Sequence, residues 1–380
     1  MKKGTKTIKI LTVVGARPNF VKVAPLVRRI QEFNEDSSRP EKISHILVHT
    51  GQHYNYNLSK VFFDELSIPM PDVYLGIGSG THAEQTAKIM LSLEKVLFKL
   101  NPHIVVVVGD VNSTLACALT AVKAEFPVAH IEAGLRCYDR TLPEEVNRLL
   151  TDAIADLLFA PSEDAANNLK KENIAEERIF FVGNIMIDCL IEHEKEIENS
   201  QILQKLGLTP KNYALLTLHR NKNVDEAEIL SGILRAVNRL SEQICIVFPI
   251  HPRTLKRIAE FGLNDLIGPR ILLVEPLGYI DFLKLLKNSK FVMTDSGGVQ
   301  EETTFCGVPC LTLRETTERP ITVISGTNEV VGVEEESIIH WGRKALRDEW
   351  KKGSIPTLWD GKTSHRVLQI LVEYALKSGL

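Results

Sequence analysis

The sequence predicts an α/β protein with two domains, each built on an open parallel β-sheet. Short apolar runs alternate with longer amphipathic segments, a pattern typical of parallel sheets with right-handed helical crossovers. Residues 104–108 form an uninterrupted apolar run, as expected for a parallel strand that is buried on both faces. The chain has 380 residues, which is too long for one compact core, and the pattern pauses after residue 187 and then restarts.

Strands and helices are predicted to alternate along the first half of the chain. Its helical segments include one from Pro25 to residue 33 and one at 83–100, where Ile89, Leu93 and Leu97 share one side. A third helix is expected at 115–124. Apolar runs predict strands at 8–14, 43–49, 104–108, 128–132 and 157–160. We therefore expect an N-terminal domain over residues 1–187.

The second half repeats this organisation over residues 188–363. Glutamates alternate with apolar and basic residues within 188–211, which indicates a solvated connecting helix. The last segment, 364–377, is amphipathic and is expected to fold back on the first half. Strands are predicted at 213–218, 244–250, 271–274, 291–293 and 310–313, and helices at 226–240, 279–287 and from Val299 onward.

Composition excludes several classes of function. The formal net charge is −3, with 44% hydrophobic and 24% charged residues, and no long basic run indicates nucleic-acid binding. No apolar stretch approaches the roughly 18 residues of a membrane helix, and no signal-peptide core follows the basic first residues. The six cysteines are scattered without zinc-ligand spacing. We expect a cytoplasmic protein with reduced thiols, no metal and no cofactor.

Polar residues cluster where the predicted strands end, which is the edge at which open α/β sheets bind ligands, so a cleft between the two halves is expected. The strand at 291–293 is followed by Asp295-Ser296-Gly297-Gly298 and then by a helix. A helix start attracts phosphate, and glycines allow close approach of a ligand. Glu302, one turn later, suits a ligand with hydroxyls, such as a ribose. The alternative is an ordinary turn with Ser296 as the N-cap.

Three acidic residues follow strands or begin a helix in the first half: Asp110, Glu132 and Glu144. Carboxylates that converge from separate loops divide general acid and general base roles in enzymes. Each also has a structural interpretation. Asp110 could hydrogen-bond its turn, Arg136 could neutralise Glu132, and Glu144 could compensate the helix dipole.

Basic and polar residues lie at the remaining strand ends. Arg17 and Lys22 follow the first strand, where they could contact an anion or form a surface pair. Gln52 and His53 lie in a loop after the second strand, and His251 follows a strand of the second half. In that half the further anion-binding candidates are His219, Arg220 and Arg319.

Eight motifs occur in an order and spacing that closely resemble the non-hydrolysing UDP-N-acetylglucosamine 2-epimerase family. They are Gly-Ala-Arg-Pro-Asn-Phe-Val-Lys, Thr-Gly-Gln-His, Gly-Asp-Val-Asn-Ser-Thr, Ile-Glu-Ala-Gly-Leu-Arg, Pro-Glu-Glu-Val-Asn-Arg, Leu-His-Arg, Asp-Ser-Gly-Gly-Val-Gln-Glu-Glu and Thr-Glu-Arg-Pro. The resemblance covers about residues 8–375. It implies two Rossmann-like domains of the glycosyltransferase B type, a UDP-sugar substrate, no nicotinamide, no obligatory metal and a homodimer.

The resemblance also implies a mechanism. UDP leaves C1 as a base removes the C2 proton, giving a 2-acetamidoglucal, and UDP then adds back after reprotonation on the other face. The catalytic residues it implies are Asp110, Glu132, Glu144 and His219. The substrate-binding residues it implies are Arg17, Lys22, Arg148, Arg220, Ser296, Gly297, Gly298, Glu302 and Arg319.

Departures from the family pattern leave the substrate and the regulation open. Gln52, His53 and His251 lie in motifs tied to an allosteric activator site, and the His-Pro-Arg-Thr sequence at His251 differs from the common bacterial form. Residues 19–23 differ as well, which would fit a related UDP-2,3-diacetamido sugar. The same motifs are also compatible with a hydrolysing epimerase that releases N-acetylmannosamine, with a retaining glycosyltransferase and with a non-catalytic UDP-sugar sensor.

Overall fold

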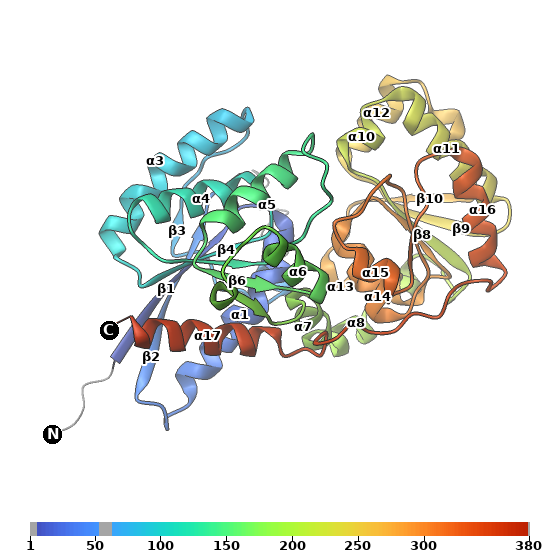
Figure 1. The fold of residues 1–380 in the computed structure, drawn as a ribbon. Helices are drawn as coiled ribbons and strands as arrows, with labels where there is room; N and C mark the ends of the chain where they lie inside the picture. Colours follow the sequence, from blue (N-terminus) through green and yellow to red (C-terminus); the bar gives the residue numbers. More distant parts are fainter. Residues whose placement is uncertain (1–5, 53–62, 379–380) are drawn as a thin grey trace. The chain divides into compact units, whose positions relative to one another are not determined.

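The structure is a computed structural model that describes residues 6–52 and 63–378 (Figure 1). The chain divides into two compact units. The first comprises Met1–Glu192 together with Thr357–Leu380, and the second is His193–Pro356. The sequence placed the division at residues 187 and 363. Each unit is built on one parallel sheet, as the sequence predicted.

The first unit contains a seven-stranded sheet in the order β3-β2-β1-β4-β5-β6-β7, and all neighbouring strands run parallel. Its strands are β1 (Lys6–Val14), β2 (Glu41–His49), β3 (Val73–Tyr74), β4 (Ile104–Val108), β5 (Val128–Ile131), β6 (Leu157–Ala160) and β7 (Ile179–Phe181). The chain winds outward from β1 to β3 and then returns to β4 beside β1. Ligands of such sheets bind where this order reverses.

Helices cover both faces of this sheet. They are α1 (Arg17–Glu35), α3 (His82–Leu100), α4 (Asn112–Lys123), α5 (Pro143–Ile154), α6 (Glu163–Lys171), the short 3-10 helix η1 (Glu176–Arg178), α7 (Ile185–Glu192) and α17 (Thr363–Lys377). Figure 1 shows α3, α4 and α5 on one face and α1, α7 and α17 on the other. The predicted side of α3 is confirmed, because Ile89, Leu93 and Leu97 are fully buried.

The predicted start of the first helix was wrong. We expected the helix to begin at Pro25, but α1 begins at Arg17 and Pro25 lies inside it. Proline is favourable in the first helical turn, and Pro18 already occupies that place. The Asn19 side chain accepts hydrogen bonds from the N–H groups of Gly15 and Ala16, at 3.1 and 3.0 Å, and so fixes the entry to α1. The apolar residues after Asn19 are buried and keep the helix continuous through Pro25.

The second unit contains a six-stranded parallel sheet in the order β10-β9-β8-β11-β12-β13, with the same reversal between β8 and β11. Its strands are β8 (Tyr213–Thr217), β9 (Cys245–Pro249), β10 (Ile271–Val274), β11 (Val292–Thr294), β12 (Cys310–Thr312) and β13 (Asn328–Val330). Its helices are α8 (Glu194–Asn199), α9 (Ile202–Lys205), α10 (Asn221–Val224), α11 (Ala227–Ser241), α12 (Pro252–Glu260), the 3-10 helix η2 (Asn264–Leu266), α13 (Tyr279–Asn288), α14 (Gly297–Cys306), α15 (Pro320–Ile324) and α16 (Glu335–Leu346).

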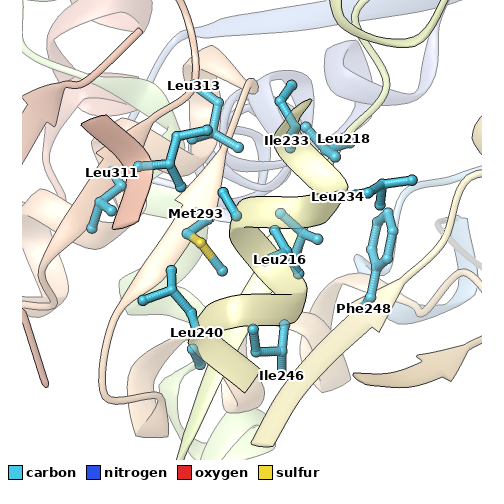
Figure 2. Close-up of a cluster of buried hydrophobic side chains, with 14 of the residues drawn as sticks. Leu216, Leu218, Ile233, Leu234, Leu240, Ile246, Phe248, Met293, Leu311 and Leu313 are labelled. Atoms are coloured by element: carbon cyan, nitrogen blue, oxygen red, sulfur yellow. The ribbon is translucent and has the colours of Figure 1, made fainter. Parts of the chain in front are cut away.

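Helix α11 anchors the core of the second unit. Figure 2 shows Ile233, Leu234 and Leu240 of α11 facing apolar side chains of the sheet, among them Leu216 and Phe248. All five side chains are fully buried. Burial of each such side chain stabilises the fold by about 1.5–3 kcal/mol, so this layer fixes α11 on β8 and β9.

The solvated helix predicted over residues 188–211 is not continuous. The segment instead contains the end of α7 and the short helices α8 and α9. Its first residue, Asp188, is fully buried rather than solvated. The alternating glutamates that suggested a solvated helix begin only at Glu192, after this buried turn.

Asp188 binds the last helix to the first unit. Its two carboxylate oxygens accept hydrogen bonds from the N–H groups of Thr363 and Ser364, at 3.1 and 2.7 Å, in the first turn of α17. These donors have no partner within their own helix, so Asp188 caps α17 from α7. Nearby, the Trp359 indole donates to the carbonyl of Pro161 at 3.0 Å. The C-terminal segment therefore packs on the first unit through α1 and α7.

We predict that Asp188→Ala loosens α17, because it leaves two buried N–H donors without their acceptor. We expect the free energy of unfolding to fall by about 1–3 kcal/mol. Faster amide exchange at residues 363–377 and a lower melting temperature measure this change. Glu176→Ala is the matched control, since the Glu176 side chain is 77% exposed and forms a surface ion pair with Lys170. Exchange at α17 that is equal in Asp188→Ala and the wild type would contradict the capping role.

Candidate active site

The polar residues of the first unit gather at the carboxyl ends of β4 and β5. Asp110 follows β4 after Gly109, and Glu132 directly follows β5. Residue 132 has a φ of +71°, a left-handed conformation that is uncommon for a glutamate. Such conformations persist only where the surroundings hold them, and they are frequent in functional sites.

Lys22 of α1 forms a buried ion pair with Glu132. The exposed fractions of the two side chains are only 7% and 3%. Gly109 makes room for this pair, because a Cβ at that position would stand 3.3 Å from Lys22 Nζ and 3.5 Å from Glu132 Oε2. Glu132 is thus neutralised by Lys22. Arg136, the partner considered from the sequence, forms ion pairs with Asp152 and Glu172 instead.

Asp110 is positioned by α5. Arg148 donates to Asp110 Oδ2 at 2.5 Å, and Asn147 donates to the Asp110 carbonyl at 2.9 Å. The guanidinium of Arg148 also donates to Glu145 Oε2, at 2.9 Å from Nε and 2.5 Å from Nη2. Asp110 keeps 26% of its side chain exposed, whereas Glu145 is buried. Arg148, proposed from the sequence as a substrate contact, here links the two carboxylates.

Glu145 is a site residue that the sequence interpretation missed. Its oxygens accept the N–H groups of Cys137 and Tyr138, at 3.2 and 2.8 Å, and so hold the loop after Glu132. Burial raises the pKa of Glu145, but Arg148 and these N–H groups outweigh burial, and the pKa lies below its ordinary value. Its neighbour Glu144 is half-buried in the first turn of α5. The missed signal was the helical spacing of Glu145, Arg148 and Asp152, which places three charged residues on one buried face.

The loop after β2 joins the same edge. Gln52 Oε1 accepts hydrogen bonds from the N–H and hydroxyl of Ser113, at 3.0 and 2.6 Å, and Ser113 also contacts the Thr50 hydroxyl at 2.8 Å. His53 and the side chain of Arg17 lie outside the described residues, so their predicted roles stay predictions.

In the second unit, Asp295 follows β11 at the point where the strand order reverses. Its carboxylate accepts the N–H groups of His219 and Arg220, each at 2.9 Å, and contacts His219 Nδ1 at 2.9 Å. Burial raises the pKa of Asp295, but these contacts outweigh burial and leave the pKa below its ordinary value. The contact orients His219 through Nδ1 and leaves its side chain 44% exposed. The sequence showed Asp295 only as part of a turn.

Helix α14 begins directly after Asp295. Ser296 occupies the N-cap position, but its side chain makes no capping hydrogen bond. Gly297 and Gly298 form the first turn. A Cβ on Gly297 would overlap the guanidinium of Arg319 and stand 2.6 Å from Glu318 Oε1. Glycine at 297 therefore allows an arginine to approach the positive end of the helix.

Arg319 belongs to a buried cluster of arginines and glutamates. It pairs with Glu301 at 3.0 Å and with Glu318 at 2.5 Å, and Arg314 reaches Glu318 at 2.7 Å. Arg220 lies farther away, at 3.7 Å from Glu318, and is 25% exposed. The cluster brings three cations close to the start of α14, balanced in part by two carboxylates.

Glu302 lies beside this cluster on α14. Burial and the charge of Glu301 raise the pKa of Glu302 to about 8, although a hydrogen bond from Tyr279 lowers it. The carboxyl is therefore mostly protonated at neutral pH. His251 lies elsewhere in the unit. It is exposed at the N-cap of α12, where its Nδ1 accepts the N–H of Arg253 at 3.2 Å.

A family model described as UDP-N-acetylglucosamine 2-epimerase matches residues 35–372. The chain belongs to the UDP-N-acetylglucosamine 2-epimerase family. The UDP-N-acetylglucosamine 2-epimerase of Methanocaldococcus jannaschii is 44% identical over 373 residues, which are 96% of this chain and 99% of that protein. The UDP-2,3-diacetamido-2,3-dideoxy-D-glucuronate 2-epimerase of Pseudomonas aeruginosa is 40% identical over 89% of this chain and 92% of its own length.

Solved epimerase structures have the same fold. The Methanocaldococcus jannaschii enzyme in complex with UDP-GlcNAc and UDP matches with a TM-score of 0.88 and 43% identity, covering 96% of this chain and all of that one. The expected fold class, two Rossmann-like domains of the glycosyltransferase B type with parallel sheets, is confirmed.

Residues 6–52 and 63–378 contain neither a membrane-spanning helix nor a metal-binding cluster. No helix in these ranges is long and apolar enough to cross a membrane. Nor does this part of the chain bring together three His, Cys, Asp or Glu side chains that could hold a metal ion. The six cysteines are free thiols.

We predict that Glu302→Gln removes a pH-dependent cost of folding. The unfolded carboxyl loses its proton near its ordinary pKa of 4.5, while the folded one keeps it to about pH 8. The free energy of unfolding of the wild type should fall as the pH rises from about 4.5 to about 8, whereas that of Glu302→Gln should not. Melting temperatures of ligand-free protein at pH 5 and pH 8 measure it. Glu336→Gln, at an exposed position of α16, is the control. A difference between Glu302→Gln and the wild type that stays constant with pH would contradict the assignment.

Proposed function

We propose that this protein interconverts UDP-N-acetylglucosamine and UDP-N-acetylmannosamine without releasing free sugar. One observation carries the proposal. Two carboxylates at the carboxyl ends of β4 and β5, Asp110 and Glu132, lie in different surroundings, each beside its own cation. Proton removal from one face of C2 and return to the other requires two such groups. Glu144, at the start of α5, is the third candidate.

The second unit supplies the residues that we propose for UDP. The N–H groups at the start of α14 and the guanidinium of Arg220 suit the diphosphate. His219, held by Asp295, presents Nε2 to an anion or to a departing oxygen. Arg319 lies at the same helix start and adds positive charge there. It also forms buried ion pairs with Glu301 and Glu318, which stabilise the fold.

Glu302 would bind the ribose. A protonated carboxyl both donates and accepts a hydrogen bond, so it can serve the two hydroxyls of a ribose without burying a negative charge. Its raised pKa fits this role better than an ionised carboxylate would.

The proposed reaction proceeds by elimination and addition. A carboxylate removes the C2 proton while the bond between C1 and the UDP oxygen breaks, giving a 2-acetamidoglucal and bound UDP. A second group returns a proton to the opposite face of C2, and UDP adds back at C1. UDP must stay bound throughout, which is why the cations of the second unit matter. Either carboxylate can serve either face of the sugar in this scheme.

A second substrate is favoured by one specific observation. The Pseudomonas aeruginosa relative, which is named for a UDP-2,3-diacetamido uronate, is nearly as similar to this chain as the UDP-N-acetylglucosamine enzymes are. Its substrate undergoes the same change at C2. Both UDP-sugars should therefore be offered in parallel, and the better substrate is the one with the higher kcat/KM.

We predict that the amide variants Asp110→Asn and Glu132→Gln lose about 10²–10⁴-fold in kcat, the usual contribution of a general acid or base. UDP affinity by calorimetry should remain within a few-fold of wild type. Glu94→Gln on the exposed face of α3 is the control and should keep full activity. The wild type should accumulate UDP-N-acetylmannosamine with little free UDP. Stoichiometric UDP release would instead identify a hydrolysing enzyme, and binding with no turnover would identify a sensor.

We also predict that Gly297→Ala weakens UDP binding about tenfold or more, because the methyl displaces Arg319 from the start of α14. Gly232→Ala is the matched control. A Cβ there has only Arg235 Nη2 nearby, at 3.7 Å, and the position lies inside α11. Equal UDP affinity in Gly297→Ala and wild type would show that the start of α14 is not part of the proposed UDP site.

Three further expectations stay predictions. The homodimer is tested by the mass of the protein in solution, and the cytoplasmic location by cell fractionation. The allosteric role of Gln52, His53 and His251 is tested by whether initial rates depend sigmoidally on substrate.

A further inference from the structure

A group of buried polar residues lies beneath the first-unit carboxylates and is not used in the mechanism above. His130 of β5 and Asp152 of α5 are both fully buried, and His130 Nδ1 contacts Asp152 Oδ1 at 2.6 Å. The other ring nitrogen, Nε2, contacts the carbonyl oxygen of Gly109 at 2.8 Å. Asp152 Oδ2 accepts the N–H of Gly134 at 2.9 Å and pairs with Arg136 at 2.8 Å.

These contacts determine the charge of His130. A carbonyl oxygen can only accept, so Nε2 must carry a proton. Burial raises the pKa of Asp152, but His130, Arg136 and the Gly134 N–H outweigh burial and keep it ionised. An ionised carboxylate also only accepts, so Nδ1 must carry a proton as well. His130 is then a buried imidazolium.

The surrounding charges balance. His130 and Arg136 supply two positive charges, and Asp152 and Glu172 supply two negative ones. Glu172 is bound by Arg136 through two hydrogen bonds, at 2.8 and 2.7 Å. The neighbouring charged groups at this edge of the sheet are paired among themselves, Lys22 with Glu132, and Arg148 with Asp110 and Glu145. This balance makes a buried imidazolium tolerable.

The group is attached to both loops that carry the proposed acid and base. Gly109 immediately precedes Asp110, and Gly134 is two residues after Glu132. Gly109, Glu132 and Gly134 all have positive φ, at +71°, +71° and +83°. Glycine adopts a positive φ without strain, whereas Glu132 needs contacts from its surroundings to keep this conformation.

We propose that His130 and Asp152 are positioning residues that hold the Asp110 loop and the Glu132 loop in fixed positions relative to each other. Asp152 binds the backbone of the Glu132 loop, and His130 carries the connection across to the backbone before Asp110. This inference rests on the proposed function for its catalytic readout. The hydrogen bonds, rather than the charge of His130, provide the positioning.

Two substitutions of Asp152 separate the effect of the hydrogen bonds from the effect of the charge on His130. In Asp152→Asn, the amide oxygen can accept from Gly134 and Arg136 while the amide nitrogen donates to His130 Nδ1. His130 becomes a neutral ring with its proton on Nε2, and every connection is kept. In Asp152→Ala the connection is lost. We expect Asp152→Asn to keep kcat within a few-fold, and Asp152→Ala to lose about 10–100-fold in kcat, as expected for misplaced reacting groups. UDP affinity should stay unchanged in both.

Nitrogen-15 NMR of histidine-labelled protein gives a readout independent of activity. The wild type should show one ring with both nitrogens protonated, and that signal should change to a neutral Nε2–H ring in Asp152→Asn. A wild-type His130 ring without a proton on Nε2 overturns the proposal even if Asp152→Ala does not fold, because the hydrogen bond to the Gly109 carbonyl would then be absent. Wild-type kcat in a folded Asp152→Ala also overturns it, as does a parallel loss of UDP affinity, which would indicate a global structural role. An inactive wild type would instead refute the proposed function.

Discussion

Burial of charge at the carboxyl ends of the strands is the constraint on which the site depends. A carboxylate in this environment is costly unless a cation or N–H donors compensate it. The structure meets that requirement separately at each position, with Lys22 beside Glu132, Arg148 between Asp110 and Glu145, and His219 with two backbone N–H groups on Asp295. The partners compensate the buried charge and fix where the carboxylates point, and they lower the pKa of Glu145 and of Asp295. The same contacts therefore stabilise the fold and fix the positions of the side chains that we propose for the chemistry.

Carboxyl groups of the same kind lie in different environments in the two units, and the proposed roles follow from that difference. Glu132 is almost completely buried with its lysine, whereas Asp110 is partly exposed, and such a contrast is how paired carboxylates divide acid and base duties. Glu302 is the opposite case. It has an acidic neighbour, Glu301, and retains its proton to a high pH, which suits hydrogen bonding to neutral hydroxyls. The two sheets share the same reversal of strand order, so each unit presents its polar residues at an equivalent edge.

The sequence was sufficient for features set by local pattern. The strand at residues 104–108 matches β4. The turn expected at Asp295-Ser296-Gly297-Gly298 does lie between a strand and a helix, but α14 begins at Gly297 rather than at Val299, so both glycines belong to its first turn. Pairing between distant residues was not predictable. Arg136, four residues along the chain, was the expected partner of Glu132, whereas tertiary packing brings Lys22 of α1 to it. The start of α1 was missed because the local preference of proline for a first turn fits Pro18 as well as Pro25. The buried face of α5 was in principle readable from its charged residues at helical spacing.

The central claim is that the carboxylates of the first unit exchange a proton at C2 of a UDP-sugar while UDP is retained. Proton NMR of the reaction in deuterium oxide tests it most directly. Elimination and re-addition predict that deuterium appears at C2 of both the N-acetylglucosamine and the N-acetylmannosamine isomers as they interconvert, with UDP still attached to the sugar. Interconversion that keeps the original hydrogen at C2 of both isomers would contradict the account.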